Sequence, residues 1–345
     1  MSVASALASG FEPTPQLAEA AVRQAMEKAG LTQAGGIVLF LSADFARHAH
    51  AAVLAAARAA GSLQVAGMVV PGLFTESGWS LDRPAAGALA LGDGLALGPA
   101  PEDGNGPLLS FSANSALPPE WQAPPPRAGL MHNDSPLWQA GRLAEAGRTQ
   151  TAVLGARCRL SVSTGLRLLG PFQTVDQARN HDLIRFGRLA AVESLIRALP
   201  PEIRDRSPLP THLLCLVREG DLQPAIPILA ANADGSLTLA ERLMPGEKAA
   251  WAVRQPVAAE ADMTASLAAA AAECPAPAFG LMFSCIGRGP LFYGDDDRDL
   301  AAFRTRFPGV PLLGAYGSSQ IAPAGRANRQ WQNSVITALF EADHV

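Results

Sequence analysis

The segment FGLMFSCIGRGPLFYG, residues 279–294, gives the clearest indication of how this chain folds. It opens with an unbroken apolar run, which predicts a strand buried on both faces. The run ends at Ser284 and Cys285, and Gly287, Arg288 and Gly289 follow at once, so we expect a turn directly after the strand. The segment DLAAFRTRF then predicts a helix, and VPLLGAYGSSQI predicts the next strand.

The first half of the chain repeats this order of elements. GGIVLFLS (35–42) predicts a buried strand, the Ala-rich segment 43–61 a helix, and VAGMVV (65–70) a second strand. The distance is 31 residues from Gly36 to Gly67 and 34 residues from Gly280 to Gly314, which suggests two related α/β units. We therefore predict a mixed α/β fold, with two sheets packed together, helices outside, and a shared cleft lined by the turns after equivalent strands.

Two other segments carry helix-start signals. Thr14 and Pro15 precede an amphipathic stretch that ends before Gly30, so a helix is expected over 14–29. GDDDRD (294–299) has three consecutive carboxylates, but a calcium loop needs alternating oxygen ligands. We interpret this run as the N-terminal cap of the following helix, where negative charge is favourable.

The overall composition excludes several classes of protein. Apolar residues make up 48% of the 345 residues, charged residues 17%, and the net charge is -4, which indicates a well-buried globular protein with two domains as the expectation. No basic run is interleaved with aromatic residues, so we expect no nucleic-acid partner. No apolar run approaches the length of about 20 residues that a membrane helix needs. Four scattered cysteines without a secretory signal suggest the cytoplasm.

Motif searches do not favour a standard enzyme or metal protein. The chain has no phosphate-binding loop, no HExxH, no GxSxG and no GxGxxG after a strand. His48 and His50 are expected on different faces of a helix, and the cysteines lack zinc-ligand spacing. We therefore predict no metal site.

The turn after Cys285 has the composition of a ligand-binding corner. Gly287 and Gly289 would let successive backbone N–H groups form an anion-binding nest. Arg288 adds a planar guanidinium group that suits a carboxylate, and both features favour a thiolate. Cys285 can then be a nucleophile, a wall of a ligand pocket or a buried structural thiol, and the lack of an evident base favours a pocket over catalysis.

At this point the sequence resembles a known family, the FIST proteins, which are sensory domains of bacterial signalling systems and also occur fused to F-box segments. The family's "FSC-x-GRG" turn and "PL-x-G" strand are similar to residues 283–289 and 311–314. An upstream family element is similar to STGLRLLGPFQTVDQARN (163–180). The resemblance implies a FIST N-terminal-like domain over 1–187 and a FIST C-terminal-like domain over 188–345. Ser319-Gln320 stands where the family has Gly-Glu, and Leu166 where it has Cys.

The resemblance implies a non-catalytic sensor that binds a small ligand, such as an amino acid or another carboxylate, between two α/β units and signals to a separate partner. The expected ligand-binding residues are Ser284, Cys285, Gly287, Arg288, Gly289, Tyr316, Gln320, Arg167 and Asn180.

Three alternatives remain open from the sequence. Some family members are haem-binding nitric-oxide sensors that regulate a histidine kinase, and His181 and His132 are the candidate haem ligands here. A cysteine-dependent enzyme using Cys285 is the second alternative. A partner-recognition domain without a small ligand is the third.

Overall fold

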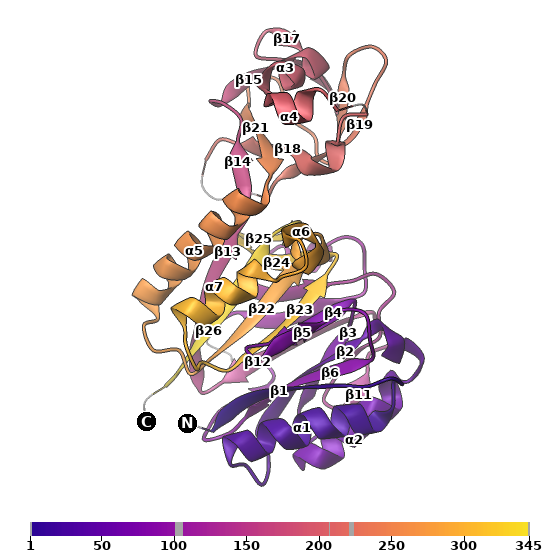
Figure 1. Cartoon of the computed structure of the whole chain (residues 1–345), viewed down its shortest axis with the longest axis vertical. Coiled ribbons are helices and arrows are strands. Elements are labelled where there is room, and N and C mark those ends of the chain that lie inside the picture. Colours follow the sequence, from indigo (N-terminus) through magenta and orange to yellow (C-terminus); the bar gives the residue numbers. More distant parts are fainter. Residues whose placement is uncertain (1, 101–105, 207, 221–223, 344–345) are drawn as a thin grey trace. The chain divides into compact units, whose positions relative to one another are not determined.

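The computed structural model describes residues 2–100, 106–206, 208–220 and 224–343. These residues form two compact units (Figure 1). The first unit combines Met1–Ser163 with Met263–Val345, and the second unit is Thr164–Asp262. The fold is mixed α/β, as the sequence predicted.

The first sheet of the first unit belongs to the N-terminal half of the chain. Its order is β1 (Val3–Ser9), β6 (Ala85–Leu91), β2 (Gly36–Ser42), β3 (Val65–Val70), β10 (Leu137–Gln139) and β11 (Arg142–Leu143). The strands β2 and β3 are parallel, whereas β6 runs antiparallel to both β1 and β2. Every residue of β2 is buried, which explains its unbroken apolar sequence.

The second sheet has the same plan but comes mainly from the C-terminal half. Its order is β13 (Ala156–Ser163), β26 (Val335–Ala342), β22 (Phe279–Cys285), β23 (Leu312–Gly317), β4 (Gly72–Thr75) and β5 (Gly78–Ser80). Here β22 and β23 are parallel, and β26 is antiparallel to both β13 and β22. The two sheets therefore match strand for strand, and the duplication that the sequence suggested is present in the topology.

The third sheet is built from both halves of the chain. Its order is β25 (Ala327–Trp331), β24 (Ser319–Ala324), β9 (Arg127–Met131), β8 (Leu108–Ser112), β12 (Arg148–Leu154) and β7 (Ala96–Gly98). The strands β24 and β9 are antiparallel, with Gln320 opposite Leu130. This pairing joins segments that are almost 190 residues apart in sequence.

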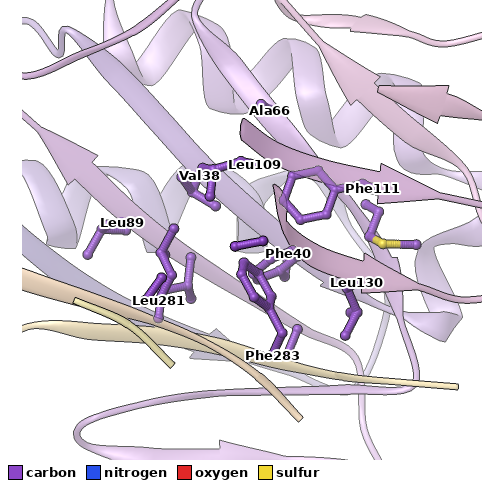
Figure 2. Close-up of a cluster of buried hydrophobic side chains, with 14 of the residues drawn as sticks. Val38, Phe40, Ala66, Leu89, Leu109, Phe111, Leu130, Leu281 and Phe283 are labelled. Atoms are coloured by element: carbon purple, nitrogen blue, oxygen red, sulfur yellow. The ribbon is translucent and has the colours of Figure 1, made fainter. Parts of the chain in front are cut away.

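One hydrophobic core joins the three sheets (Figure 2). Phe40 of β2, Phe111 of β8 and Phe283 of β22 meet at its centre, with ring centroids 5.6–6.5 Å apart in edge-to-face arrangements. Such pairs stabilise a core beyond their buried area. Apolar side chains therefore fill the middle of the space between the sheets.

Helices cover the outer faces of the first and second sheets. The helices α1 (Pro15–Ala29) and α2 (Ala49–Ala60) pack on the first sheet. The predicted cap is confirmed, because Thr14 is the N-cap of α1 and Gly30 follows with φ 69°. On the second sheet lie α7 (Arg298–Arg306) and the Met263–Ala271 part of α5 (Pro256–Glu273). In the described part of the chain, no helix is long and apolar enough to cross a membrane.

The second unit has its own sheet and core (Figure 1). The sheet has the order β14-β21-β15-β16-β20-β19-β18, and a further pairing of β18 with β21 closes most of it into a ring. The strand bounds are β14 Leu166–Leu168, β15 Gln173–Arg179, β16 Asp182–Phe186, β17 Leu189–Ala190, β18 Leu214–Arg218, β19 Ile226–Ala231, β20 Leu237–Leu239 and β21 Lys248–Arg254. The helices α3 (Ala191–Ala198) and α4 (Pro201–Arg204) complete the unit.

The second unit is an insertion into the second repeat. In the first repeat α1 follows β1 directly, whereas in the second repeat residues 164–262 separate β13 from the part of α5 that packs on the sheet. The sequence-domain boundary that we expected at residues 187 and 188 falls between β16 and β17, inside this insertion. That boundary concerns family domains rather than compact units, so it stays a prediction.

Candidate functional site

The candidate site lies where two parallel strands of the second sheet end. β22 ends at Cys285 opposite Gly317 of β23, and Ser284 is opposite Tyr316. A short 3₁₀ helix, η4 (Ile286–Arg288), and α6 (Pro290–Tyr293) follow β22. Ligands favour the carboxyl ends of parallel strands, so this position is consistent with a binding site.

Alternation along the strands divides the site into two faces. Phe283 contributes to the core between the sheets, whereas Met282 packs with α5 and α7. Because side chains two residues apart point the same way, Cys285 faces the core side with Phe283, and Ser284 faces the helix side with Met282.

On the helix side, Arg288 is held in a buried ion pair. Its Nε donates to Oδ2 of Asp299 and its Nη2 donates to Oδ1, each at 3.0 Å. Both side chains are 2% exposed. The guanidinium also donates to the carbonyl and hydroxyl oxygens of Ser163, at 2.9 and 2.7 Å, and Tyr293 donates to Asp299 Oδ1 at 2.9 Å. A carboxylate of the protein thus occupies the fork that we expected to bind a ligand's carboxylate.

A second buried carboxyl group lies beside this pair. Asp297 is the N-cap of α7, and its Oδ1 accepts from the Leu300 N–H at 2.9 Å, so the capping prediction is confirmed. The Tyr316 hydroxyl donates to Asp297 Oδ2. Tyr316 and Gln320 are both fully buried. Tyr316 therefore packs as a core residue with a satisfied hydroxyl group.

Burial dominates the proton equilibria of this network. Burial raises the pKa of Asp299 to about 6, against the opposing attraction of Arg288. It also raises the pKa of Asp297, although the Tyr316 hydroxyl hydrogen bond works against the shift. For Arg288, burial works to lower the pKa, but the Asp299 carboxylate outweighs it and the net shift is upward. The network consequently responds to pH near neutrality.

The two glycines of the turn serve close packing. Gly289 has φ -77°, and a Cβ there would lie 3.2 Å from the Tyr316 ring. A Cβ on Gly287 would lie 2.8 Å from Asn333 Oδ1. Neither glycine has a positive φ, and the Gly289 N–H donates to the Ile286 carbonyl. The Gly289 N–H is thus used within the 3₁₀ turn, and the anion-binding nest that we expected here stays a prediction.

On the core side, Gln320 is a polar side chain without partners. Gln320 shares a face of β24 with Ala322, which belongs to the core between the sheets. It is 0% exposed, and among the residues that the structure describes neither its amide nitrogen nor its amide oxygen has a hydrogen-bond partner. Burying an amide without partners costs several kcal/mol, roughly 2–7 depending on the reference state. A buried polar group of this kind is normally hydrogen-bonded, here by a water molecule or a ligand.

Ser318 connects Gln320 to the ends of two further strands. The N–H and hydroxyl groups of Ser318 donate to the carbonyl of Met131, the last residue of β9, at 2.9 and 3.0 Å. The Sγ of Cys285 lies 3.9 Å from the Ser318 carbonyl oxygen. His132 follows Met131 directly, its buried Nδ1 has no hydrogen-bond partner in the part of the chain that the structure describes, and burial lowers its pKa. Polar groups from β9, β22 and β24 therefore gather at this end of the core.

The remaining predicted residues belong to the second unit. Arg167 is an exposed residue of β14, opposite Val253 of β21. Asn180 has φ 56° in the turn between β15 and β16, where asparagine tolerates the left-handed conformation. His181 is exposed, and its Nδ1 lies 3.0 Å from the Leu239 carbonyl oxygen. The structure brings the other predicted residues together in the first unit, without these three.

The sequence analysis missed three members of the buried network: Ser163, Tyr293 and Asp299. The acidic run at 294–299 was the available signal, but it indicated only a cap. The pattern of apolar residues did not indicate that the Asp299 side chain would contact Arg288. Ser163 is distant in sequence and reaches Arg288 because β13 pairs with β26 beside β22.

Comparison with known proteins supports the family resemblance for part of the chain. Residues 191–323 match the FIST C domain. Two uncharacterized proteins, one from Mycobacterium tuberculosis and one from Mycobacterium bovis, are each 26% identical, over 223 and 229 residues respectively. The matches cover 61% and 62% of this chain and 58% of each relative, so the chain spans less than two thirds of their length. The C-terminal part of the resemblance is thereby confirmed, and the N-terminal part stays a prediction.

Proposed function

Because residues 191–323 match the FIST C domain, a sensory domain family, we propose that this protein is a non-catalytic sensor that binds a small polar ligand and signals to a separate partner. Gln320 is the observation that carries the ligand-binding part. A buried amide whose donor and acceptor are both unused within the described residues offers a ligand two hydrogen bonds. Gln320 lies two residues after Ser318, whose carbonyl oxygen is 3.9 Å from Cys285 Sγ.

The chemistry of this corner selects a small molecule with both a donor and an acceptor. An amino acid has both groups and another carboxylate has the acceptor, so the amide of Gln320 can pair with either without a change of its own charge. Arg288 is committed to Asp299 at 3.0 Å, so it holds the turn in place rather than the ligand.

A non-catalytic role is supported by the surroundings of Cys285. A cysteine nucleophile requires a general base within hydrogen-bond reach. In the described part of the chain, the contact of Cys285 Sγ is with the Ser318 carbonyl oxygen, which cannot take its proton. The four cysteines are free, which agrees with the proposed cytoplasmic location. A signalling protein such as a histidine kinase is the partner class that the family implies.

The ligand proposal is tested with Gln320→Leu, with the exposed Gln332→Leu as a matched control. Protein purified gently from cells is measured by native mass spectrometry. We expect a non-covalent mass above that of the 35.8 kDa chain in the wild type and the control, and its loss in Gln320→Leu. Stability of the empty Gln320→Leu protein should equal or exceed that of the wild type freed of its ligand, because the variant no longer buries an unpaired amide. An identical bound mass in Gln320→Leu would refute a role for this residue.

Haem is the second candidate, and one observation favours it. The buried Nδ1 of His132 has no hydrogen-bond partner among the described residues, and burial favours the neutral imidazole that ligates iron. An absorption spectrum after mixing with hemin should then show a Soret band that His132→Ala shifts or abolishes. A spectrum unchanged by His132→Ala would remove this candidate, and His181→Ala serves as the control.

A further inference from the structure

A pocket in the first unit, at the opposite end of β9 from His132, has features of an anion site. It has a volume of about 360 Å³ and is lined by residues of η2 (Pro119–Trp121), β9 and β12. Arg127 opens β9, whereas His132 follows its end. Gln320 is opposite Leu130, about 10 Å along β9 from Arg127, and the side chains of Leu130 and Arg127 point to opposite faces of the sheet, so this pocket is separate from the Gln320 corner. Its volume lies at the small end of ligand pockets and fits a molecule of a few carbon atoms.

Arg127 is the central residue of the pocket. It is 5% exposed, and its Nη1 donates to Ser110 Oγ at 3.0 Å and to Gln150 Oε1 at 2.8 Å. The guanidinium carbon lies 4.7 Å from the centre of the Trp121 ring. The buried Nε has no hydrogen-bond partner in the described part of the chain. Stacking and two hydrogen bonds thus fix the plane of the guanidinium group and leave its Nε edge for a ligand.

The loop that carries Trp121 and Arg127 is held in place by one buried side chain. Asn328 of β25 is 2% exposed. Its amide nitrogen donates to the carbonyl oxygens of Trp121, Ala123 and Pro125, at 2.9–3.1 Å, and its oxygen accepts from the Arg127 N–H at 3.0 Å. All four hydrogen bonds serve a surface loop. A pocket ordered in this way loses little conformational entropy when a ligand binds.

The charges around the pocket favour a monoanion. Arg148 forms an ion pair with Glu120 at 2.6 Å, so these two lining residues cancel each other and Arg127 supplies the excess positive charge. Thr149 also lines the pocket, but it pairs with the core residue Phe111, so its hydroxyl group points to the opposite face of the sheet from Arg127. The edge of the guanidinium group that carries Nε matches the two oxygens of a carboxylate.

We propose that this pocket binds a small monocarboxylate, with the Nε edge of Arg127 donating to the carboxylate. The inference goes beyond the proposed function and does not depend on it, because the Gln320 corner shares no residue with this pocket. Arg127 is its binding residue, and Asn328 positions the loop.

The probe for this site is sodium butyrate, measured by isothermal titration calorimetry at low ionic strength. Butyramide serves as the uncharged isostere and sodium chloride as the ionic control. We expect saturable binding of butyrate alone. Arg127→Met should weaken it by about tenfold or more, the effect of losing a hydrogen bond to a charged group. The matched variant Arg329→Met, at an exposed position of β25, should bind as the wild type does. Equal binding of butyrate and butyramide would overturn the proposal.

A second experiment uses a variant that should bind butyrate more tightly. It is needed because Arg127→Met removes a buried group and risks misfolding. The Glu120 side chain is 50% exposed, so Glu120→Gln is a mild substitution. It releases Arg148 from its ion pair and adds one positive charge to the pocket. We expect butyrate to bind at least about twofold more tightly, with the gain shrinking as salt is added. Unchanged or weaker binding in Glu120→Gln would overturn the assignment, whatever Arg127→Met does.

Discussion

Replacing Arg288 with methionine tests the buried network at the end of β22. The substitution removes both donors to Asp299, each at 3.0 Å, and leaves the carboxylate with Tyr293. Both side chains of the pair are 2% exposed, so water does not replace the lost charge. Breaking a buried pair by removing one partner costs about 3–5 kcal/mol of unfolding free energy. We expect this full cost at pH 8.

The cost should fall at lower pH, and the sign follows from the pKa of Asp299. Its pKa is about 6 in the folded protein against a reference of 3.8, so its contribution to stability is greatest below pH 4 and is lost as the pH rises through 6. Without Arg288 the folded-state pKa rises further, and the loss extends to higher pH. At pH 5 Asp299 is largely protonated in both proteins, so the cost should fall toward that of the lost hydrogen bonds to Ser163.

The assay is urea unfolding of wild type and variant at pH 5, 6, 7 and 8. Both proteins carry Trp251→Phe, because Trp251 lies in the second unit while Trp79, Trp121, Trp138 and Trp331 lie in the first. Tryptophan fluorescence then reports the first unit alone. The double variant Arg288→Met/Asp299→Leu is the control, and it should regain most of the stability at pH 8. An equal cost at pH 5 and pH 8, or no recovery in the double variant, would refute the reasoning.

Two further substitutions test the packing of the second sheet. Tyr316→Phe removes the hydroxyl donor to Asp297 and should cost about 1–3 kcal/mol of unfolding free energy, measured in urea. The cost should be larger at pH 7 than at pH 4, because the pKa of the unpaired Asp297 carboxyl group rises further. A cost that does not change with pH would contradict this. Gly314→Ala places a Cβ 2.0 Å from the Phe74 ring and should cost about 1–3 kcal/mol or more, whereas Gly78→Ala, which meets open space, should be nearly neutral. Similar urea midpoints for Gly314→Ala and Gly78→Ala would contradict this, because they would show that the Phe74 ring moves aside at little cost.

Local patterns predicted the elements and the repeat. The apolar run 36–42 is a strand with every residue buried, and Thr14, Pro15 and Gly30 mark the bounds of α1. Hydrophobic periodicity indicates burial, and capping residues indicate helix ends. Strands and helix bounds can therefore be predicted from a short stretch of sequence, without knowing which segments pack against it. The mixed α/β class and the internal duplication followed from the same signals.

Long-range pairings were beyond the sequence signals. The third sheet combines β8, β9 and β12 with β24 and β25, and no pattern in either half of the sequence predicts this pairing. Arg127 follows three prolines that indicate only a loop, yet a side chain of β25 orders that loop. Arginine often binds a ligand's carboxylate, but in this fold Arg288 pairs with the carboxylate of Asp299. Composition names the available groups, and only the fold decides which of them pair.

The most direct test of the proposed sensor is an experimental high-resolution structure of the protein as purified from cells, refined around Gln320. The account predicts density for a bound molecule within hydrogen-bond distance of both Nε2 and Oε1, in contact with the side of the core that holds Cys285. Density for ordered water alone, with each water bonded to main-chain groups around Gln320, would contradict it, since solvent would then satisfy the amide and leave no vacancy for a ligand.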